Sequence, residues 1–208
     1  MHKTPSHLLT FLPTWGSIAW YRELIRAERV VIEAHEHFVK STYRNRYEVA
    51  GPNGVLALTV PKQGGKDRRA AYADVGIAHE HDWIGDHWKT LTAGYRRSPY
   101  FEYYEDGLRR FYQTAWTGLF AYNRAALEHS LDLLGLDVDI EWTERYEANP
   151  SGLIDRRSAL ERPRDRTAMD AGPRYPQVFE EKTGFLENLS ILDLLFCEGP
   201  NARAVLEA

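Results

Sequence analysis

The apolar and polar positions of the chain first follow a strand–helix–strand order. The runs His7–Leu12 and Arg29–Ala34 are short and apolar, and the second is rich in β-branched residues, which indicates strands. Between them, Ile18–Ala27 carries apolar residues at helical spacing. This order predicts a parallel βαβ unit at the start of the fold.

A β-hairpin is predicted next. Side chains alternate in character along Thr42–Val49, and Val55–Val60 is again strand-like. Asn53-Gly54 lies between these two runs, and Asn-Gly is a strong hairpin signal. We expect one more strand over Asp74–Ala78.

The period becomes helical in the middle of the chain. Here apolar residues recur three or four positions apart. The predicted elements are a helix from Asp82 with Ile84, Trp88, Leu91 and Tyr95 on one face, a helix over Phe101–Phe111, a helix over Phe120–Leu134 with Gly135 as its C-cap, and a last strand over Asp137–Trp142.

The 208 residues predict a single α/β domain. It should have a mixed sheet, a βαβ start, a β-hairpin and a helical covering layer. We expect an α/β core over residues 1–142 and a polar, mobile loop over 143–174, which is rich in Arg, Asp, Pro and Gly. Residues 175–208 should form a C-terminal helical segment that packs on the core, with a short helix over Ile191–Cys197.

Composition narrows the class of protein. The net charge of −4 argues against nucleic acid as a partner. No stretch approaches the roughly 20 apolar residues of a membrane helix, so we expect no membrane insertion, and the Pro-interrupted start does not resemble a signal peptide. The single cysteine, Cys197, excludes an internal disulfide and fits a cytoplasmic location.

The strongest candidate site is residues 35–46, HEHFVKSTYRNR, which lie between two predicted strands. The segment is basic and rich in hydrogen-bonding groups, which suits an anionic or polyhydroxylated small molecule. The alternative is a solvated edge strand whose charges keep it soluble. A second candidate anion site is the turn Pro13–Ser17, because the free N–H groups at a helix start attract anions.

Roles follow from the residue types. His35 or His37 is the predicted general base, because the pKa of imidazole lies near neutrality. Arg44 and Arg46 are expected to share a strand face and to bind phosphate or carboxylate, unless they pair with Glu48 or Glu33. The other predicted ligand-binding residues are Lys40, Tyr43, Asn45, Lys62, His87, Trp88 and Tyr95, with Lys66 as a further cation near them.

Two questions about bound groups stay open in the sequence. Glu33, His35 and His37 would share one face of a strand and so form an alternative metal site. We predict no metal, because no further ligand lies at suitable spacing. The sequence does not specify a cofactor.

Several segments together resemble the WbqC-like family of bacterial proteins. They are TYRNR at Thr42–Arg46, the Pro-Asn-Gly hairpin followed by LTVP at Leu58–Pro61, His87-Trp88, SPYFEYYED at Ser98–Asp106, and NLSILDLLF-x-EGP at Asn188–Pro200. Many members open with His-Gln-Pro, where this chain has Leu8 and Leu9 after His7. The resemblance implies a role in making bacterial surface polysaccharide such as O-antigen, with acyl or aminoacyl transfer to an amino sugar.

Two functions are therefore compared. The first is a transferase acting on an activated sugar or acyl donor, with His35 or His37 as base and the arginines holding the donor. The second is a non-catalytic ligand-binding or scaffold protein of a cell-envelope pathway. A buried histidine beside the ligand would favour the transferase, whereas inward-facing arginine with outward-facing histidine would favour the binding protein.

Overall fold

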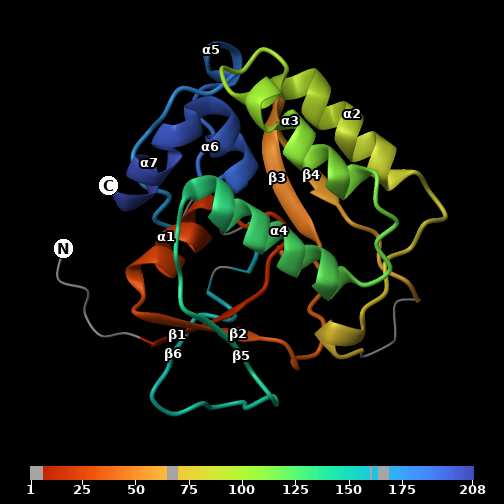
Figure 1. Ribbon diagram of the computed structural model, residues 1–208, viewed down its shortest axis with the longest axis vertical. Coiled ribbons are helices and arrows are strands. Elements are labelled where there is room, and N and C mark those ends of the chain that lie inside the picture. Colours follow the sequence, from red (N-terminus) through yellow and green to blue (C-terminus); the bar gives the residue numbers. More distant parts are fainter. Residues whose placement is uncertain (1–6, 65–69, 160, 164–168) are drawn as a thin grey trace.

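A parallel sheet lies at one end of the molecule (Figure 1). The computed structural model describes residues 7–64, 70–159, 161–163 and 169–208. The strands of the sheet, in spatial order, are β5 (Ile140–Trp142), β2 (Arg29–Glu33), β1 (His7–Phe11) and β6 (Ile154–Asp155). All neighbouring strands in it pair in parallel.

Helix α1 (Ile18–Arg26) connects β1 to β2 and confirms the predicted βαβ start. Its Trp20 indole donates to the Thr10 hydroxyl, so α1 covers the sheet face that carries Thr10. Neighbouring residues of a strand point to opposite faces, and Leu9 therefore points away from α1. The order of the strands places β2 and β5 on one side of β1 and β6 on the other. The topological switch point of the sheet consequently lies between β1 and β6.

The predicted hairpin is confirmed, but it forms a sheet of its own. Strands β3 (Arg46–Gly51) and β4 (Gly54–Thr59) pair only with each other, so two sheets take the place of one mixed sheet. Gly51 pairs with Gly54, which leaves Pro52 and Asn53 in the turn. Gly54 has φ +114°, a backbone conformation that favours glycine.

The strand expected over Asp74–Ala78 does not form. Residues Tyr72–Asp74 form a 3₁₀ helix, and the segment after it makes isolated bridges from Gly76 and Ile77. Tyr72 is fully buried and its hydroxyl donates to the Leu12 carbonyl oxygen at 2.6 Å. This anchor turns the chain toward the end of β1.

Helices cover the sheet and the hairpin (Figure 1). They are α2 (Trp83–Tyr95), α3 (Phe101–Arg109), α4 (Leu119–Leu134), α5 (Glu180–Thr183), α6 (Ile191–Glu198) and α7 (Ala202–Glu207), with 3₁₀ turns at Arg110–Tyr112 and Gly199–Asn201. Helix α6 lies in the core, where Phe196 packs against Tyr95 and Phe101.

The buried face of α2 is rotated from the expected one. Its buried residues are Trp83, His87, Leu91 and Tyr95, whereas Trp88 is half-buried. Burial of the large Trp83 side chain, one position before Ile84, sets this rotation. It turns His87 inward and moves Trp88 toward the surface.

The segment 143–174 was expected to be a loop, yet it contributes to the sheet and the core. It contains β6, which pairs with β1 at Leu8 and Leu9. The side chains of Arg157 and Glu161 are buried. Buried charges of this kind are tolerated because each finds an oppositely charged partner near the sheet.

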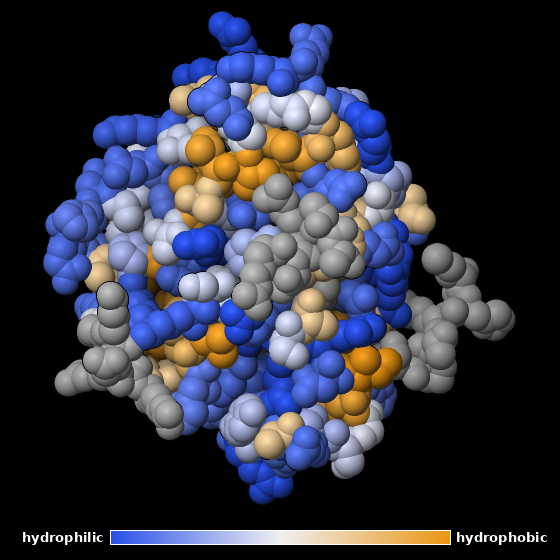
Figure 2. Space-filling view, turned by 180° about the vertical axis from the view of Figure 1, so that it is seen from behind, coloured by the Kyte–Doolittle hydropathy of each residue, from blue (hydrophilic) through white to orange (hydrophobic). Residues whose placement is uncertain are grey.

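The surface opposite to that of Figure 1 is mostly hydrophilic, with hydrophobic side chains gathered in a band across its upper part (Figure 2). Within the described residues, no helix is long and apolar enough to span a bilayer.

The C-cap of α4 gives a test of the fold. Gly135 has φ +60°, and no atom lies within 4 Å of the position that a Cβ would take there. An alanine would therefore meet no steric clash, and its cost would come from the backbone conformation alone. Gly135→Ala should lower the free energy of unfolding by about 1 kcal/mol, the cost of a left-handed alanine. Gly118→Ala, at the other end of α4 where φ is −114°, is the control. Urea unfolding measures both, and equal effects would contradict the αL cap.

Candidate functional site

A buried arginine occupies the switch point of the parallel sheet. Arg44 is 1% exposed, and its guanidinium lies 4.5 Å from the ring centroid of Phe11, the last residue of β1. The guanidinium also donates to the carbonyl oxygen of Arg157, two residues after β6. Arg44 thus fills the crevice where open α/β sheets usually bind their ligands.

Two carboxylates neutralise this arginine. Glu36 accepts from Nε at 2.6 Å and from Nη2 at 2.9 Å, a bidentate contact, and Glu161 accepts from Nη1 at 2.7 Å. Burial raises the pKa of the Glu36 carboxyl, and the hydrogen bonds from Arg44 oppose that rise. The guanidinium is therefore committed to protein partners.

A second buried ion pair lies beside the first. Glu33, at the end of β2, is 1% exposed and accepts from Arg157 Nη1 at 3.1 Å and from the Thr143 hydroxyl at 2.8 Å. Arg157 also donates hydrogen bonds to the Asp155 carboxylate, and these hold the pKa of the Asp155 carboxyl below its usual range. Arg157 thus ties the end of β2 to the end of β6.

The predicted anion site at Pro13–Ser17 is closed by protein groups. The N–H groups at the start of α1 donate to the Leu189 carbonyl oxygen, the Asn188 side-chain oxygen and the Ser17 hydroxyl. Thr14 is buried and donates to the Arg44 carbonyl oxygen. No donor of this helix start is left for a ligand, because segments distant in sequence cap it.

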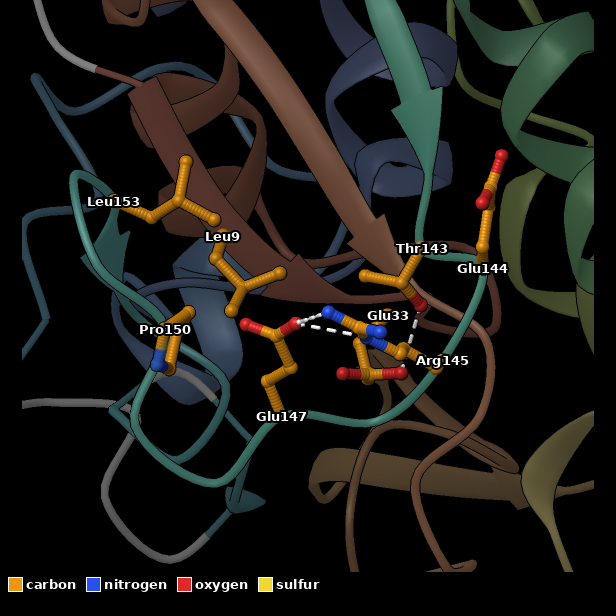
Figure 3. Close-up of a pocket in the computed structure, with 8 residues that line it drawn as sticks. All are labelled: Leu9, Glu33, Thr143, Glu144, Arg145, Glu147, Pro150 and Leu153. Carbon is orange, nitrogen blue, oxygen red and sulfur yellow. Dashed lines mark hydrogen bonds and ion pairs between the residues drawn. The ribbon is translucent and has the colours of Figure 1, made fainter.

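An open cleft lies next to the ion pairs, on the sheet face away from α1 (Figure 3). Its volume is about 410 Å³, within the range of small-molecule sites. The residues that line it are Leu9, Glu33, Thr143, Glu144, Arg145, Glu147, Pro150 and Leu153. They come from β1, from the carboxyl end of β2 and from the segment that follows β5.

Four of the polar side chains that line the cleft form two hydrogen-bonded pairs. Thr143 holds Glu33 at 2.8 Å, and Arg145 Nε donates to Glu147 at 3.0 Å (Figure 3). Leu9, Pro150 and Leu153 supply an apolar side. An arrangement of carboxylate, hydroxyl and guanidinium groups beside a small apolar surface can hydrogen-bond a polyhydroxylated molecule and contact its C–H face.

Comparison with known proteins gives the family. The sequence model of the WbqC-like protein family matches residues 10–169. The chain belongs to this family. The match runs from Thr10 in β1 through the segment that carries Arg157 and Glu161, and so contains both ion pairs and every residue of the cleft lining except Leu9. No curated protein and no solved structure matches.

The predicted catalytic histidines of this WbqC-like chain face the solvent. β2 ends at Glu33, and His35 and His37 beyond it are exposed, as is Lys40. Glu33 points inward, so Glu33, His35 and His37 do not share the strand face on which the metal alternative rested. Among the described residues, no group of three or more His, Cys, Asp or Glu side chains is placed to hold a metal ion.

The expected arginine pair of the family motif TYRNR is split. β3 begins only at Arg46, so Arg44 precedes the strand and turns into the core, while Arg46 contacts the Thr59 hydroxyl near the surface. Asn45 donates to the Val60 carbonyl oxygen and so fastens the hairpin. Tyr43 is buried and donates to Glu48. The motif thus organises the fold around Arg44.

Lys62 lines a hollow whose lining includes neither Arg44 nor Arg46. This small hollow of about 140 Å³ is also lined by Phe38 and Asp74, and the Lys62 ammonium lies 6.0 Å from the Phe38 ring centroid. Lys66 falls outside the described residues.

His87 is part of a buried polar chain within an aromatic core. Its Nδ1 lies 3.2 Å from the Tyr47 hydroxyl, which lies 3.1 Å from the Tyr112 hydroxyl. Burial lowers the pKa of His87 to about 4. Tyr95 serves the core as well, donating at 2.5 Å to the buried carboxylate of Asp193. The burial of His87 and Tyr95 argues against direct contact with a ligand.

The cleft residues Thr143, Arg145 and Glu147 were missed because 143–174 was interpreted as a loop. A signal was present, since Asp137–Trp142 was predicted to be a strand. Residues that follow the carboxyl end of a parallel strand are candidates for a site. That rule, applied to this strand, would have indicated Thr143 and the charged residues after it.

Substitution of Arg44 tests how much its ion pairs with Glu36 and Glu161 contribute to stability. Arg44→Met should lower the free energy of unfolding by about 3–5 kcal/mol, because it leaves buried carboxylates without their partner. Arg46→Met, two positions away and half-exposed, is the matched control and should change it by less than about 1 kcal/mol. Chemical denaturation measures both. Equal, small effects would show that Arg44 is free for a ligand.

Because His87 is buried as a neutral imidazole, we expect the free energy of unfolding to decrease in acid. The pKa of His87 is lowered from 6.5 to about 4, so the unfolded chain binds the proton more tightly than the folded chain between these values. Stability should fall as pH falls from 6.5 toward 4, by about 2 kcal/mol from this group between pH 7 and 5. Urea unfolding of His87→Gln should lose that part of the pH dependence, whereas the exposed-site variant His35→Gln should keep it. An unchanged pH dependence in His87→Gln would contradict burial of the neutral imidazole.

Proposed function

We propose that this protein binds a sugar-containing small molecule in the cleft beside Glu33 and acts in bacterial surface-polysaccharide biosynthesis. The observation that carries the proposal is the position of the cleft, at the carboxyl ends of β2 and β5, where α/β folds concentrate their ligand sites. Family membership supports the polysaccharide pathway. The single cysteine supports a cytoplasmic location.

The chemistry of the cleft supports a sugar. Glu33 is held in place by Thr143 and Arg157, so its carboxylate is preorganised. Glu147 and Arg145 are more exposed and offer an acceptor and donors that can rearrange around hydroxyl groups. A ligand of this type would displace little ordered structure.

Binding without catalysis is the function that the side-chain orientations favour. Arg44 faces inward and is fully paired, while His35 and His37 face outward. This is the arrangement expected of a ligand-binding protein, and it removes the imidazole base from the transferase mechanism considered above.

A transferase acting on an activated sugar or acyl donor is the second candidate, and the carboxylate of Glu147 favours it. Glu147 extends toward Leu9 within the cleft (Figure 3), and a carboxylate there can take a proton from an attacking hydroxyl or amine. In this mechanism Glu147 is the base, and Arg145 donates a hydrogen bond to it.

The cleft residues give the test. A thermal-shift screen over sugars, nucleotide sugars, coenzyme A and ATP identifies ligands, because a ligand that binds only the folded state raises the Tm. For a sugar ligand, Glu147→Gln and Arg145→Ala should each weaken binding at least tenfold, about 1.4 kcal/mol. Glu128→Gln, on the exposed side of α4, is the control.

Two outcomes would contradict the proposal. One is that no sugar-containing compound raises the Tm. The other is that one does, but its affinity is unchanged in both cleft variants. Transfer by the wild type that Glu147→Gln abolishes while sugar binding persists would favour the transferase over the binding protein.

A further inference from the structure

A second hollow is lined by residues of α2 and of the turn that follows it. Figure 1 shows α2 in the upper part of the molecule, away from the parallel sheet at the bottom. The volume of the hollow is about 560 Å³. The residues that line it are Trp88, Lys89, Thr92, Ala93, Arg96 and Arg97. Ala93 and Arg97 also line an adjoining hollow of about 590 Å³ that reaches Phe179 and Cys197. The two hollows together extend over the surface beyond the helix.

The sequence of α2 builds this hollow from two parallel rows. Residues four apart lie above one another on a helix, so Trp88, Thr92 and Arg96 form one row. Lys89 and Ala93 lie in the next row, and Arg97, in the turn that follows α2, lines the same hollow. Each row has a long side chain at its start, a small one in the middle and an arginine at its end. The small residues form the floor, and positions eight residues apart on a helix are separated by about 12 Å along its axis, at 1.5 Å per residue.

The hollow is strongly cationic. Lys89, Arg96 and Arg97 are exposed, and the guanidinium of Arg109 lies 5.4 Å from the Trp88 ring centroid. The carboxylate of Glu105 contacts both Arg96, at 3.7 Å, and Arg109, at 2.6 Å. One carboxylate is thus shared by two of these four cations.

The floor offers one more polar group. The Thr92 hydroxyl oxygen is buried and has no hydrogen-bond partner among the described residues. A hydroxyl group there can donate to an anionic oxygen that enters between the rows.

We propose that the hollow on α2 binds the phosphate groups of a diphosphate-bearing small molecule. A diphosphate can lie between the Lys89 ammonium and the guanidinium groups of Arg96 and Arg97, which offer the forked donors that phosphate oxygens accept. A purely structural role would explain Arg96 and Arg97, because cations near a helix C-terminus stabilise the helix. It accounts neither for Lys89 in the middle of α2 nor for the small residues that keep the hollow open.

The charge of the cleft supports this assignment. The carboxylates of Glu144 and Glu147 line the cleft together with the guanidinium of Arg145, while the third carboxylate of the lining, Glu33, is paired with Arg157. Such a lining repels phosphate, whereas the hollow on α2 attracts it. The two sites thus select ligands of different charge, and the α2 site does not depend on the function proposed for the cleft.

Isothermal titration calorimetry of the full chain tests the α2 site. The probes are inorganic pyrophosphate, orthophosphate and uridine diphosphate. Pyrophosphate is expected to bind saturably and more tightly than orthophosphate. The double variant Lys89→Glu/Arg97→Glu should weaken it at least tenfold, and the milder Lys89→Gln/Arg97→Gln severalfold. Arg124→Glu, an exposed arginine of α4, is the control and should bind as the wild type does.

The titration with uridine diphosphate distinguishes a nucleotide ligand from a bare diphosphate. Tighter binding than pyrophosphate, with a fluorescence change lost in Trp88→Phe, identifies a nucleotide, and equal affinity identifies a bare diphosphate. Either result supports the site. Absence of saturable binding by all three probes would overturn the proposal, as would equal pyrophosphate affinity in the wild type and in a folded Lys89→Gln/Arg97→Gln variant.

Discussion

The pairing of Arg44 with two buried carboxylates is the constraint on which the arrangement of this chain depends. A guanidinium that is 1% exposed must be neutralised within the protein. Glu36 lies 8 residues before Arg44 in the sequence, and Glu161 lies 117 residues after it. Arg44, through these carboxylates and its contact with Phe11, therefore joins the end of β1, the entry to the hairpin and the segment after β6. Thr14, Asn123 and Tyr72 converge on the Arg44 carbonyl oxygen and fix the backbone there.

This constraint also decides where a ligand is able to bind. In an open α/β sheet the crevice at the switch point usually stays open for a ligand. Here Arg44 and its carboxylates occupy it, and the start of α1 is capped by protein groups. The open volume is shifted to the neighbouring cleft, where Glu33 is held from behind by Arg157. The ion pairs act as the rear wall of the proposed sugar site.

Local patterns predicted the elements well, because each depends on residues close in sequence. The βαβ start, the Asn53-Gly54 hairpin and the Gly135 cap are of this kind. The orientation of Arg44 could not be predicted in the same way, since its partner Glu161 lies in a segment without apolar periodicity. Alternation along Thr42–Val49 placed Arg44 and Arg46 together, but alternation holds only within a strand, and β3 starts at Arg46. The inward turn of His87 likewise depended on tertiary packing of Trp83.

A crystal structure of the protein with a bound sugar-containing ligand tests the central claim most directly. The account predicts ligand density in the cleft, in contact with Glu33, Arg145 or Glu147, with the Arg44–Glu36 and Arg44–Glu161 contacts unchanged. Ligand density at the switch point, with Arg44 released from Glu36 and Glu161 and bound to the ligand, would contradict it.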